Sequence, residues 1–422
     1  MNEFDKIIGY ESEKEELARL CDTLKNRVKY EKLGMNMPQT LLLYGPPGVG
    51  KTLMAKAFIA ESKRKVFYCK KDKSDGEFIT AIKDTFAEAK KKAPSIIFFD
   101  DMDKFAEDNL NQNCNKEEFV AIQSGLEDIR GANVFVIATA NDICNLPDSL
   151  LRAGRFGRQI HVEVPDYDDS VKIIEHYLES KNIAEDVQAE LLARTLQGKP
   201  CAVLEEIMNE AAMYAGFDEE AEKICLEHVE RAIPRVLFKT IPEREKNGRA
   251  RELAAYHEAG HALVAFRKKQ NVCYVSIYND GVHGGVCFSE KSDRAHDFEE
   301  EYNEILISLA GKAAVELQFG EPAVGTDSDM EQAWNTLRDH VEKIAVYGFE
   351  YCNHTLRFEY NCSFALLDKS YDRINRLMEA CYNECRALLL QNKAALDRLA
   401  QALMAKDILF YNDIAHLLLM RD

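Results

Sequence analysis

Three short apolar runs in the first third of the chain predict buried strands of a parallel sheet. They are Thr40–Tyr44, Ser95–Phe99 and Val134–Ala140. Each is apolar nearly throughout instead of alternating, as expected for strands that are covered on both faces. Helical spacing resumes after the first run, at Leu53, Met54 and the residues that follow. The pattern therefore predicts an α/β domain at the amino-terminal end.

The pattern changes after Pro165, where apolar residues recur every three or four positions as far as Phe238. This spacing predicts a helical lid that follows the sheet domain. The next stretch, Lys239–Gly248, is polar, contains Pro and Gly, and lacks periodicity, so it is interpreted as a linker. The expected units are residues 1–165 for the large α/β subdomain, 166–238 for the lid, 239–250 for the linker and 251–422 for the last domain.

The last domain is expected to be mostly α-helical. Helical stripes run from Ser370 to Leu419, where Cys381 and Cys385 are interpreted as core thiols. Two alternating stretches, Val275–Tyr278 and Gly285–Ser289, predict a hairpin. Two interpretations of this hairpin stay open: it covers the core only, or it offers a strand edge to a bound peptide.

Composition narrows the class of protein. The chain has 422 residues, 46% of them apolar, and a net charge of −18, so several cores can form and binding to nucleic acid is disfavoured. Its twelve cysteines form no C-x-x-C pair, and no secretory signal is evident, which favours reduced thiols in a cytoplasmic protein. No apolar run is long enough for a membrane helix, so we expect no direct membrane insertion.

The segment between the first strand and the next helix, residues 45–52, has the form of a Walker A loop, G-P-P-G-V-G-K-T. Glycines let successive backbone N–H groups surround the phosphates of ATP at a helix N-terminus, while a lysine reaches the phosphate oxygens and a threonine hydroxyl ligates Mg²⁺. The residues assigned to this contact are Pro46, Pro47, Gly48, Val49, Gly50, Lys51 and Thr52.

Polar residues follow the other two strands at the same sheet edge. Asp100 and Asp101 follow the second strand, and Asn141 follows the third. Asp100 is expected to hold magnesium, Asp101 to polarise the attacking water and Asn141 to orient that water. Many such ATPases carry a glutamate at the position of Asp101, and an aspartate is one methylene shorter, so we expect slower hydrolysis of ATP. By itself, Asn141 would be an ordinary turn residue.

Two arginines lie in the later segment L-L-R-A-G-R-F-G-R, at Arg155 and Arg158. A guanidinium can stabilise the charge that develops on a γ-phosphate, and one supplied by a neighbouring subunit would imply a ring. The alternative is that both are solvated surface arginines.

The second domain contains H-E-A-G-H, with His257 and His261 four residues apart. No proline lies between Arg251 and Lys269, so helical spacing puts both imidazoles on one face, where they can share a zinc ion, Zn²⁺. Glu258 then remains available to take a proton from an activated water and pass it to a leaving amine. The alternative is a helix with one buried and one solvated histidine.

A third zinc ligand has to come from elsewhere in the chain. Asp329 is the best candidate, because Ser328 and Glu331 have capping-box spacing and place Asp329 in the first turn of a helix. An equally local explanation is that this carboxylate only favours the helix dipole.

Taken together, the Walker A loop, Asp100, Asp101, Asn141 and the arginine segment resemble the ATPase domain of the AAA+ family. The opening segment F-D-K-I-I-G is similar to the start of that domain. The resemblance implies that the backbone near Ile8 and Gly9 contacts adenine.

The H-E-A-G-H motif and the downstream segment G-T-D-S-D extend the resemblance beyond the ATPase domain. Over nearly its whole length the chain resembles the FtsH family of ATP-dependent zinc metalloproteases. The resemblance implies that His257, His261 and Asp329 hold zinc, that Glu258 is the catalytic acid and base, and that polypeptides are the substrates. It also implies a homo-hexamer in which an ATPase ring feeds a protease ring.

Two departures from the family stand out. Relatives usually begin with transmembrane helices, whereas this chain opens on the ATPase, so membrane anchoring is in doubt. Relatives thread polypeptide with an aromatic loop, but Cys69–Gly76 at that position has no aromatic residue. A second class of function therefore stays open: a protein-remodelling ATPase, or an ATP-assembled protease with little processive threading.

Overall fold

The computed structural model describes residues 2–70, 75–106, 117–152, 154–218, 221–238, 248–278, 285–289, 297–351 and 364–420. They belong to two compact units. The first consists of Met1–Ala193 and Gly198–Ala232, and the second of Arg194–Gln197 and Ile233–Asp422.

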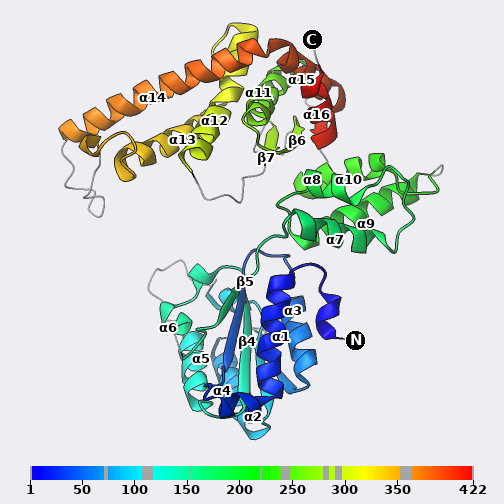
Figure 1. The fold of residues 1–422 in the computed structure, drawn as a ribbon, viewed down its shortest axis with the longest axis vertical. Coiled ribbons are helices and arrows are strands. Elements are labelled where there is room, and N and C mark those ends of the chain that lie inside the picture. The colour runs from blue at the N-terminus through cyan, green and yellow to red at the C-terminus, as the bar shows by residue number, and fades with distance from the viewer. Residues whose placement is uncertain are drawn as a thin grey trace. The chain divides into compact units, whose positions relative to one another are not determined.

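The first unit is built on a five-stranded parallel sheet with the strand order β2-β3-β4-β1-β5 (Figure 1). The strands are β1 Thr40–Tyr44, β2 Lys65–Cys69, β3 Ser95–Phe99, β4 Val134–Ala140 and β5 Gln159–His161. The three strands predicted from the apolar runs are confirmed with the expected bounds, and they form the centre of the sheet. Strands β2 and β5 lie at its edges.

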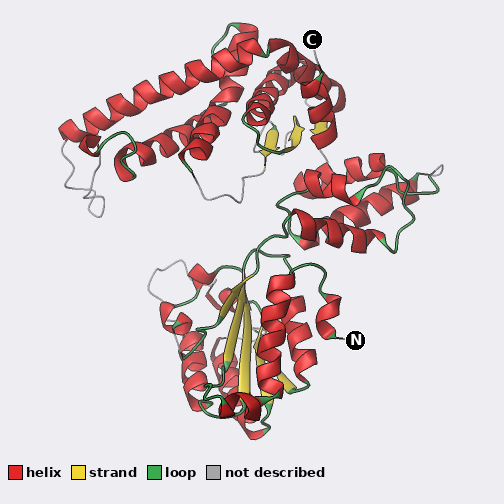
Figure 2. Ribbon diagram, viewed as in Figure 1, coloured by secondary structure: helices red, strands yellow, loops and turns green. Residues whose placement is uncertain are grey.

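Alternation along β4 shows how the two faces of the sheet are filled. Phe135 packs on Phe58 of helix α3 (Lys51–Ser62), with ring centroids 5.4 Å apart. Its neighbour Val136 belongs instead to the core that includes Phe86 of α4 (Asp75–Lys91) and Ile122 of α5 (Glu117–Asp128). Every residue of β4 is buried, because helices cover both faces (Figure 2). Because the strands are parallel and helices pack on both faces of the sheet, the carboxyl ends of the strands lie together at one edge.

The helices of the α/β part are α1 Glu11–Lys25, α2 Arg27–Lys32, α3 Lys51–Ser62, α4 Asp75–Lys91, α5 Glu117–Asp128 and α6 Asp148–Leu151, with short 3-10 turns at η1 Glu3–Lys6, η2 Met102–Ala106 and η3 Ile143–Asn145. A helical part follows, as predicted, with α7 Tyr167–Leu178, α8 Ala189–Thr195, α9 Cys201–Phe217 and α10 Leu226–Phe238. The backbone N–H of Ala202, in the first turn of α9, donates to the carbonyl of Gly48 over 3.0 Å. The helical lid therefore contacts the phosphate-binding loop directly.

The second unit is mostly helical, as predicted. Its helices are α11 Gly248–Arg267, α12 Phe298–Phe319, α13 Asp327–Arg338, α14 Phe364–Gln391, α15 Lys393–Lys406 and α16 Tyr411–Leu419, with a π-helical turn η4 at Asp339–Lys343 and a 3-10 turn η5 at Phe349–Tyr351. Helix α11 packs on α12 and α15 and contributes to one apolar core. A Cβ on Gly260 would lie 2.6 Å from the carbonyl oxygen of Ala310, so only glycine permits this approach of α11 to α12. Cys381 and Cys385 are buried in the same core, as expected.

A three-stranded antiparallel sheet lies beside α11, with the order β7-β6-β8. Its strands are β6 Val272–Ser276, β7 Val286–Ser289 and β8 Ile408–Phe410. The predicted pairing of two strands is confirmed. The first strand both begins and ends earlier than expected, so Ile277 and Tyr278 lie outside it. Residues 279–284 of the predicted turn lie outside the described part. Strand β8 corrects the expectation of helices throughout the carboxyl-terminal stretch: Asp407, at φ 66°, ends α15 and turns the chain into the sheet.

The predicted helix cap before Asp329 is wrong in its details. Helix α13 begins at Asp327, its N-cap is Thr326, and neither Ser328 nor Glu331 caps it. Gly325, at φ 79°, turns the chain just before this helix, and Asp327 and Asp329 both lie in the first turn, where the helix dipole favours carboxylates. The position of Asp329 in the first turn is confirmed.

Among the described residues, no helix has the length and apolarity needed to cross a membrane.

Candidate active sites

Helix α11 presents three residues of the H-E-A-G-H motif to one cavity. His257, Glu258 and His261 all line this cavity, as does Asp329 of α13. The helix is continuous from Gly248 to Arg267, so the two histidines are one turn apart and project from the same face. The predicted arrangement on a helix is confirmed.

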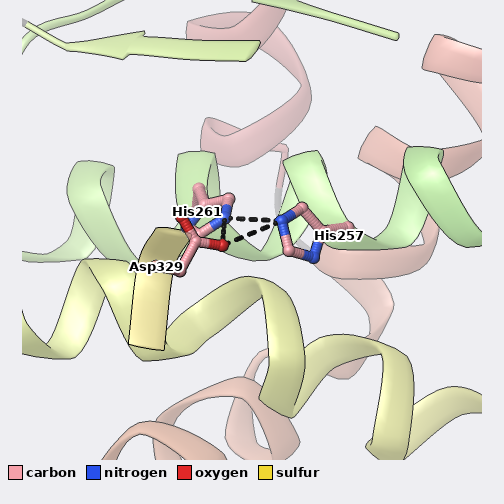
Figure 3. Close-up of side chains that lie close together, drawn as sticks. All are labelled: His257, His261 and Asp329. Carbon is pink, nitrogen blue, oxygen red and sulfur yellow. Dashed lines mark hydrogen bonds and ion pairs between the residues drawn. The ribbon is translucent and has the colours of Figure 1, made fainter. Parts of the chain in front are cut away.

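The side chains of His257, His261 and Asp329 converge on one point (Figure 3). The Nε2 atoms of the two imidazoles are 3.0 Å apart. Oδ2 of Asp329 lies 3.1 Å from Nε2 of His257 and 3.4 Å from Nε2 of His261. No other group of three such side chains within the described ranges can share a metal ion. Two imidazole nitrogens and one carboxylate oxygen are the donor set of a catalytic zinc site, which keeps a fourth position for water or substrate.

Hydrogen bonding orients one ligand for this purpose. Nδ1 of His261 lies 2.7 Å from the carbonyl oxygen of Ile307, so Nδ1 carries the proton and Nε2 presents its lone pair to the cation. Burial tends to lower the pKa of His261, but its hydrogen bond to Asp329 and the charges of Glu258 and Asp329 outweigh burial and raise that pKa. Burial likewise tends to raise the pKa of Asp329, yet hydrogen bonds from both histidines hold it well below its usual range. The carboxylate thus favours a positive charge at this point, which a zinc ion supplies.

A glycine on the facing helix leaves room for both imidazoles. A Cβ on Gly311 of α12 would lie 2.5 Å from Nδ1 of His257 and 2.5 Å from Nε2 of His261. Real Cβ atoms do not approach other atoms this closely, so any side chain at position 311 would displace the ligands. The protein around the three donors therefore has the shape that a zinc site requires.

Glu258 occupies the same cavity and is buried. A Cβ on Gly285, immediately before β7, would lie 2.6 Å from Oε1 of Glu258, so the start of this edge strand passes directly over the carboxylate. The rest of the cavity wall includes Val286 and Cys287 of β7 and the segment 321–325 before α13. The site therefore combines three metal donors, a buried carboxylate and a strand edge in one cavity.

The phosphate-binding loop of the first unit has the expected strand, loop and helix form. Gly45, Gly48 and Gly50 adopt positive φ angles of 146°, 80° and 98°, which glycine adopts without strain. The amine of Lys51 donates to the carbonyls of Gly45 and Pro46, each at 2.7 Å, and to Oδ1 of Asn141 at 3.0 Å. Burial lowers the pKa of Lys51 against the opposing charges of nearby aspartates. Lys51 and Asn141 thus lie together at the sheet edge where Asn141 was expected.

The carboxylates after β3 lie at the same sheet edge. Oδ1 of Asp100 accepts hydrogen bonds from the hydroxyls of Thr52, at 3.0 Å, and Thr139, at 2.8 Å. Asp101, at φ 51°, lines the cavity of the loop; its backbone N–H donates to Oγ1 of Thr139 over 2.9 Å, and its carboxylate pairs with Lys104 at 2.7 Å. Asp100 beside Thr52 is the arrangement that holds magnesium next to a bound nucleotide.

Two family models match the chain, and each covers the motifs of one of the two sites. Residues 41–164 match the ATPase family associated with various cellular activities (AAA), and residues 244–417 match peptidase family M41. Curated relatives named ATP-dependent zinc metalloprotease FtsH match nearly the whole chain. The relative from Synechococcus sp. is 32% identical over 95% of this chain and 67% of its own length. FtsH 2 from Thermoanaerobacter sp. is 31% identical over 96% of the chain and 80% of its own length.

The chain belongs to the FtsH family. Its fold, an AAA ATPase domain followed by a helical M41 peptidase domain, agrees with the prediction. A relative from Alkalihalophilus pseudofirmus, 30% identical over 96% of the chain, is matched over 64% of its own length. The chain thus spans about two thirds of that FtsH protein.

The opening residues for which an adenine contact is expected lie beside the lid residues of the nucleotide cavity. Ile8 lines this cavity, together with Tyr10 and with Tyr177 and Cys201 of the lid. Gly9 is at φ 70°, and a Cβ there would lie 2.8 Å from Cγ of Asp169, so glycine lets the opening segment pack against α7. Of the loop residues, Pro47 to Thr52 line the cavity, and Pro46 contributes its carbonyl to Lys51.

Both candidate arginines lie outside their own subunit's nucleotide cavity. Arg155 pairs with Glu127 at 2.9 Å and donates to the carbonyl of Ser149, while Arg158 pairs with Glu16 at 3.1 Å. The chain therefore does not place these two arginines beside the phosphates of a nucleotide in its own cavity.

Several residues of the two sites were not predicted from the sequence. Gly285 and Gly311 act through the space that they leave, and Thr139 acts through contacts with Asp100 and with the backbone of Asp101. An isolated glycine in a helical pattern was the available signal for Gly311. The divergent pore segment is residues 69–76, and its middle part, residues 71–74, lies outside the described part.

Proposed function

We propose that this FtsH-family chain is an ATP-dependent zinc endopeptidase that degrades polypeptides. The observation that carries the proposal is the convergence of His257, His261 and Asp329 beside the buried Glu258. A phosphate-binding loop lies on the same chain. A remodelling ATPase would have no use for this donor set, which disfavours that alternative.

In the proposed reaction the three donors hold zinc, which supplies Lewis acidity to a water and to the substrate carbonyl. Glu258 takes the proton of the attacking water and delivers it to the nitrogen of the leaving amine. Its burial under Gly285 keeps bulk water away from this carboxylate. Asp329 and the carbonyl of Ile307 hold the imidazoles in the orientation that the reaction needs.

A substrate peptide is proposed to lie along β7. This strand is at the edge of its sheet, pairs only with β6 among the described strands, and lines the zinc cavity. An extended peptide can add to such an edge through its backbone, so that many sequences are accepted. Strand β7 thereby aligns a scissile bond with Glu258.

Replacement of Glu258 by Gln tests the peptidase proposal. The amide retains the shape but cannot take a proton, so chelator-sensitive proteolysis should fall roughly 10²–10⁴-fold, with ATP hydrolysis and bound zinc retained. Glu304→Gln is the matched control, because Glu304 lines the same cavity and has no proposed role. Equal proteolysis by the Glu258→Gln protein and the parent would overturn the peptidase proposal, as would a purified parent without stoichiometric zinc.

In the ATPase domain, we propose that Lys51 contacts the phosphates, that Thr52 and Asp100 hold magnesium, and that Asp101 and Asn141 polarise and orient the attacking water. The supporting contacts are those of Lys51 with Asn141 and of Thr52 with Asp100. The opening residues Ile8 and Gly9 are proposed to lie against adenine.

A ring is proposed as the active assembly, with Arg155 and Arg158 acting on the neighbour's γ-phosphate. Support comes from the positions of both arginines, which do not line the nucleotide cavity of their own chain. Light scattering with ATP and magnesium should show a hexamer that Arg155→Ala weakens. Arg19→Ala, which breaks an exposed pair with Glu15, is the control. A parent that stays monomeric at micromolar concentration would refute the ring.

The cytoplasm is the proposed location. The described cysteines are all free thiols, as is usual in a reducing compartment. Thiol counting on protein that is purified without reductant and denatured in alkylating reagent checks this assignment.

A further inference from the structure

A cysteine, a histidine and an aspartate lie together at the junction of α9 and α10, apart from the residues assigned to nucleotide and zinc. Sγ of Cys225 is 3.1 Å from Nδ1 of His228. On the other side of the ring, Nε2 of His228 is 3.7 Å from Oδ2 of Asp218. Asp218 ends α9, and Cys225 immediately precedes α10. All three belong to the first unit.

The surroundings favour chemistry at the sulfur. His228 is buried, with its side chain 5% exposed, whereas Asp218 is 47% exposed and Cys225 is half-buried. Burial and the contact with Cys225 therefore hold the imidazole in place, the carboxylate of Asp218 lies near its other nitrogen at ion-pair distance, and the thiol remains within reach of small molecules. A carboxylate on one ring nitrogen and a nucleophile on the other is the arrangement by which an imidazole serves as base.

We propose that Cys225 is a reactive thiol that exchanges with low-molecular-weight disulfides, with His228 as its base and Asp218 as the residue that positions the ring. The Sγ proton passes to Nδ1 of His228, and the thiolate attacks one sulfur of the disulfide. A bond forms between Sγ and that sulfur, the original S–S bond breaks, and the departing thiolate takes up the proton from His228. Cys225 is oxidised to a mixed disulfide and one half of the reagent is reduced to a thiol.

The same contacts admit a purely structural explanation. The backbone N–H of Cys225 donates to Nδ1 of His228 over 3.1 Å, which resembles the reciprocal contact of a capping box. The next N–H, that of Leu226, donates to Asp186 over 3.1 Å, so the helix N-terminus is already satisfied near the thiol. If the group only caps α10, removal of the imidazole should leave the reactivity of the thiol unchanged.

The test compares two cysteines of the same protein. Cys144 is exposed, and no described histidine is bonded to it, so it represents an unassisted thiol. The full chain is treated at neutral pH with less than one equivalent of dithiodipyridine, a neutral disulfide. The adduct on each cysteine is then followed over time by peptide mass spectrometry. Cys225 should react at least about tenfold faster than Cys144, as an activated thiol does.

Two variants separate the base from the cap. His228→Gln retains an acceptor for the backbone N–H of Cys225 but cannot take the proton, so the rate at Cys225 should fall to that of Cys144. Asp218→Asn should slow Cys225 less. Cys144→Ser is the control and should leave the rate at Cys225 unchanged.

The proposal is overturned if Cys225 reacts no faster than Cys144 in the parent. It is also overturned if His228→Gln leaves the rate at Cys225 unchanged. Circular dichroism of each variant shows whether the helices are retained. Should His228→Gln lose them, the order of labelling in the parent together with Asp218→Asn decides the matter.

Discussion

Replacing Gly311 by alanine should release zinc although it improves the helix. Alanine in the interior of a helix is favoured over glycine by about 1 kcal/mol. At position 311, however, the added Cβ would lie 2.5 Å from Nδ1 of His257 and from Nε2 of His261, whereas ordinary contacts begin at 3.4 Å. The two rings or the helix must therefore move by about 1 Å, which exceeds the tolerance of roughly 0.2 Å in metal-ligand distances.

The expected loss in zinc affinity is at least about 10- to 100-fold, the cost of disturbing the partners of metal ligands. Competition with a chromophoric chelator measures this affinity, and circular dichroism shows whether the helices are retained. Gly216→Ala is the matched control: Gly216 lies in α9, nothing lies within 4 Å of its added Cβ, and zinc should be unaffected. Unchanged zinc affinity in folded Gly311→Ala protein would refute the packing argument.

Two further predictions concern single carboxylates. Asp101→Glu should speed steady-state ATP hydrolysis, because the longer carboxylate reaches further into the nucleotide cavity that Asp101 lines. A rate at or below that of the parent would contradict this. A parallel melting curve records any loss of stability from placing glutamate at φ 51°. For Glu316, burial tends to raise the pKa, but hydrogen bonds from Lys312 and Tyr382 outweigh burial and lower it. Its contribution to stability should therefore be complete above about pH 4.3 and be lost as the pH falls through the lowered pKa. Urea unfolding of the parent and Glu316→Gln should show a difference that shrinks in this acidic range, and a constant difference would exclude the linkage.

Local motifs predicted the sites because the chemistry depends on short spacing. The phosphate-binding loop and the His257–His261 pair each lie within one turn or loop, so their geometry follows from the local backbone. The place of Asp329 in a first helical turn was also predictable, although its cap was not. The sequence pattern thus located side chains that the structure brings together in each of the two sites.

Features that depend on distant parts of the chain were not predictable in this way. Gly311 and Gly285 matter only because α12 and β7 approach residues of α11. Strand β8 is three residues long and is a strand because β6 pairs with it, whereas its apolar residues also fit a helical stripe. Such contacts form through tertiary packing, which leaves no period in the sequence.

Degradation of two substrates under three nucleotide conditions tests the central claim most directly. A folded and an unstructured protein are each incubated with the purified chain and ATP, a non-hydrolysable analogue, or no nucleotide, beside Lys51→Ala protein. We expect chelator-sensitive loss of the folded substrate only with ATP and only in the parent. Zinc should stay bound in Lys51→Ala, because its donors lie in the other unit. Folded substrate degraded equally without nucleotide, or neither substrate degraded under any condition, would contradict an ATP-driven zinc peptidase.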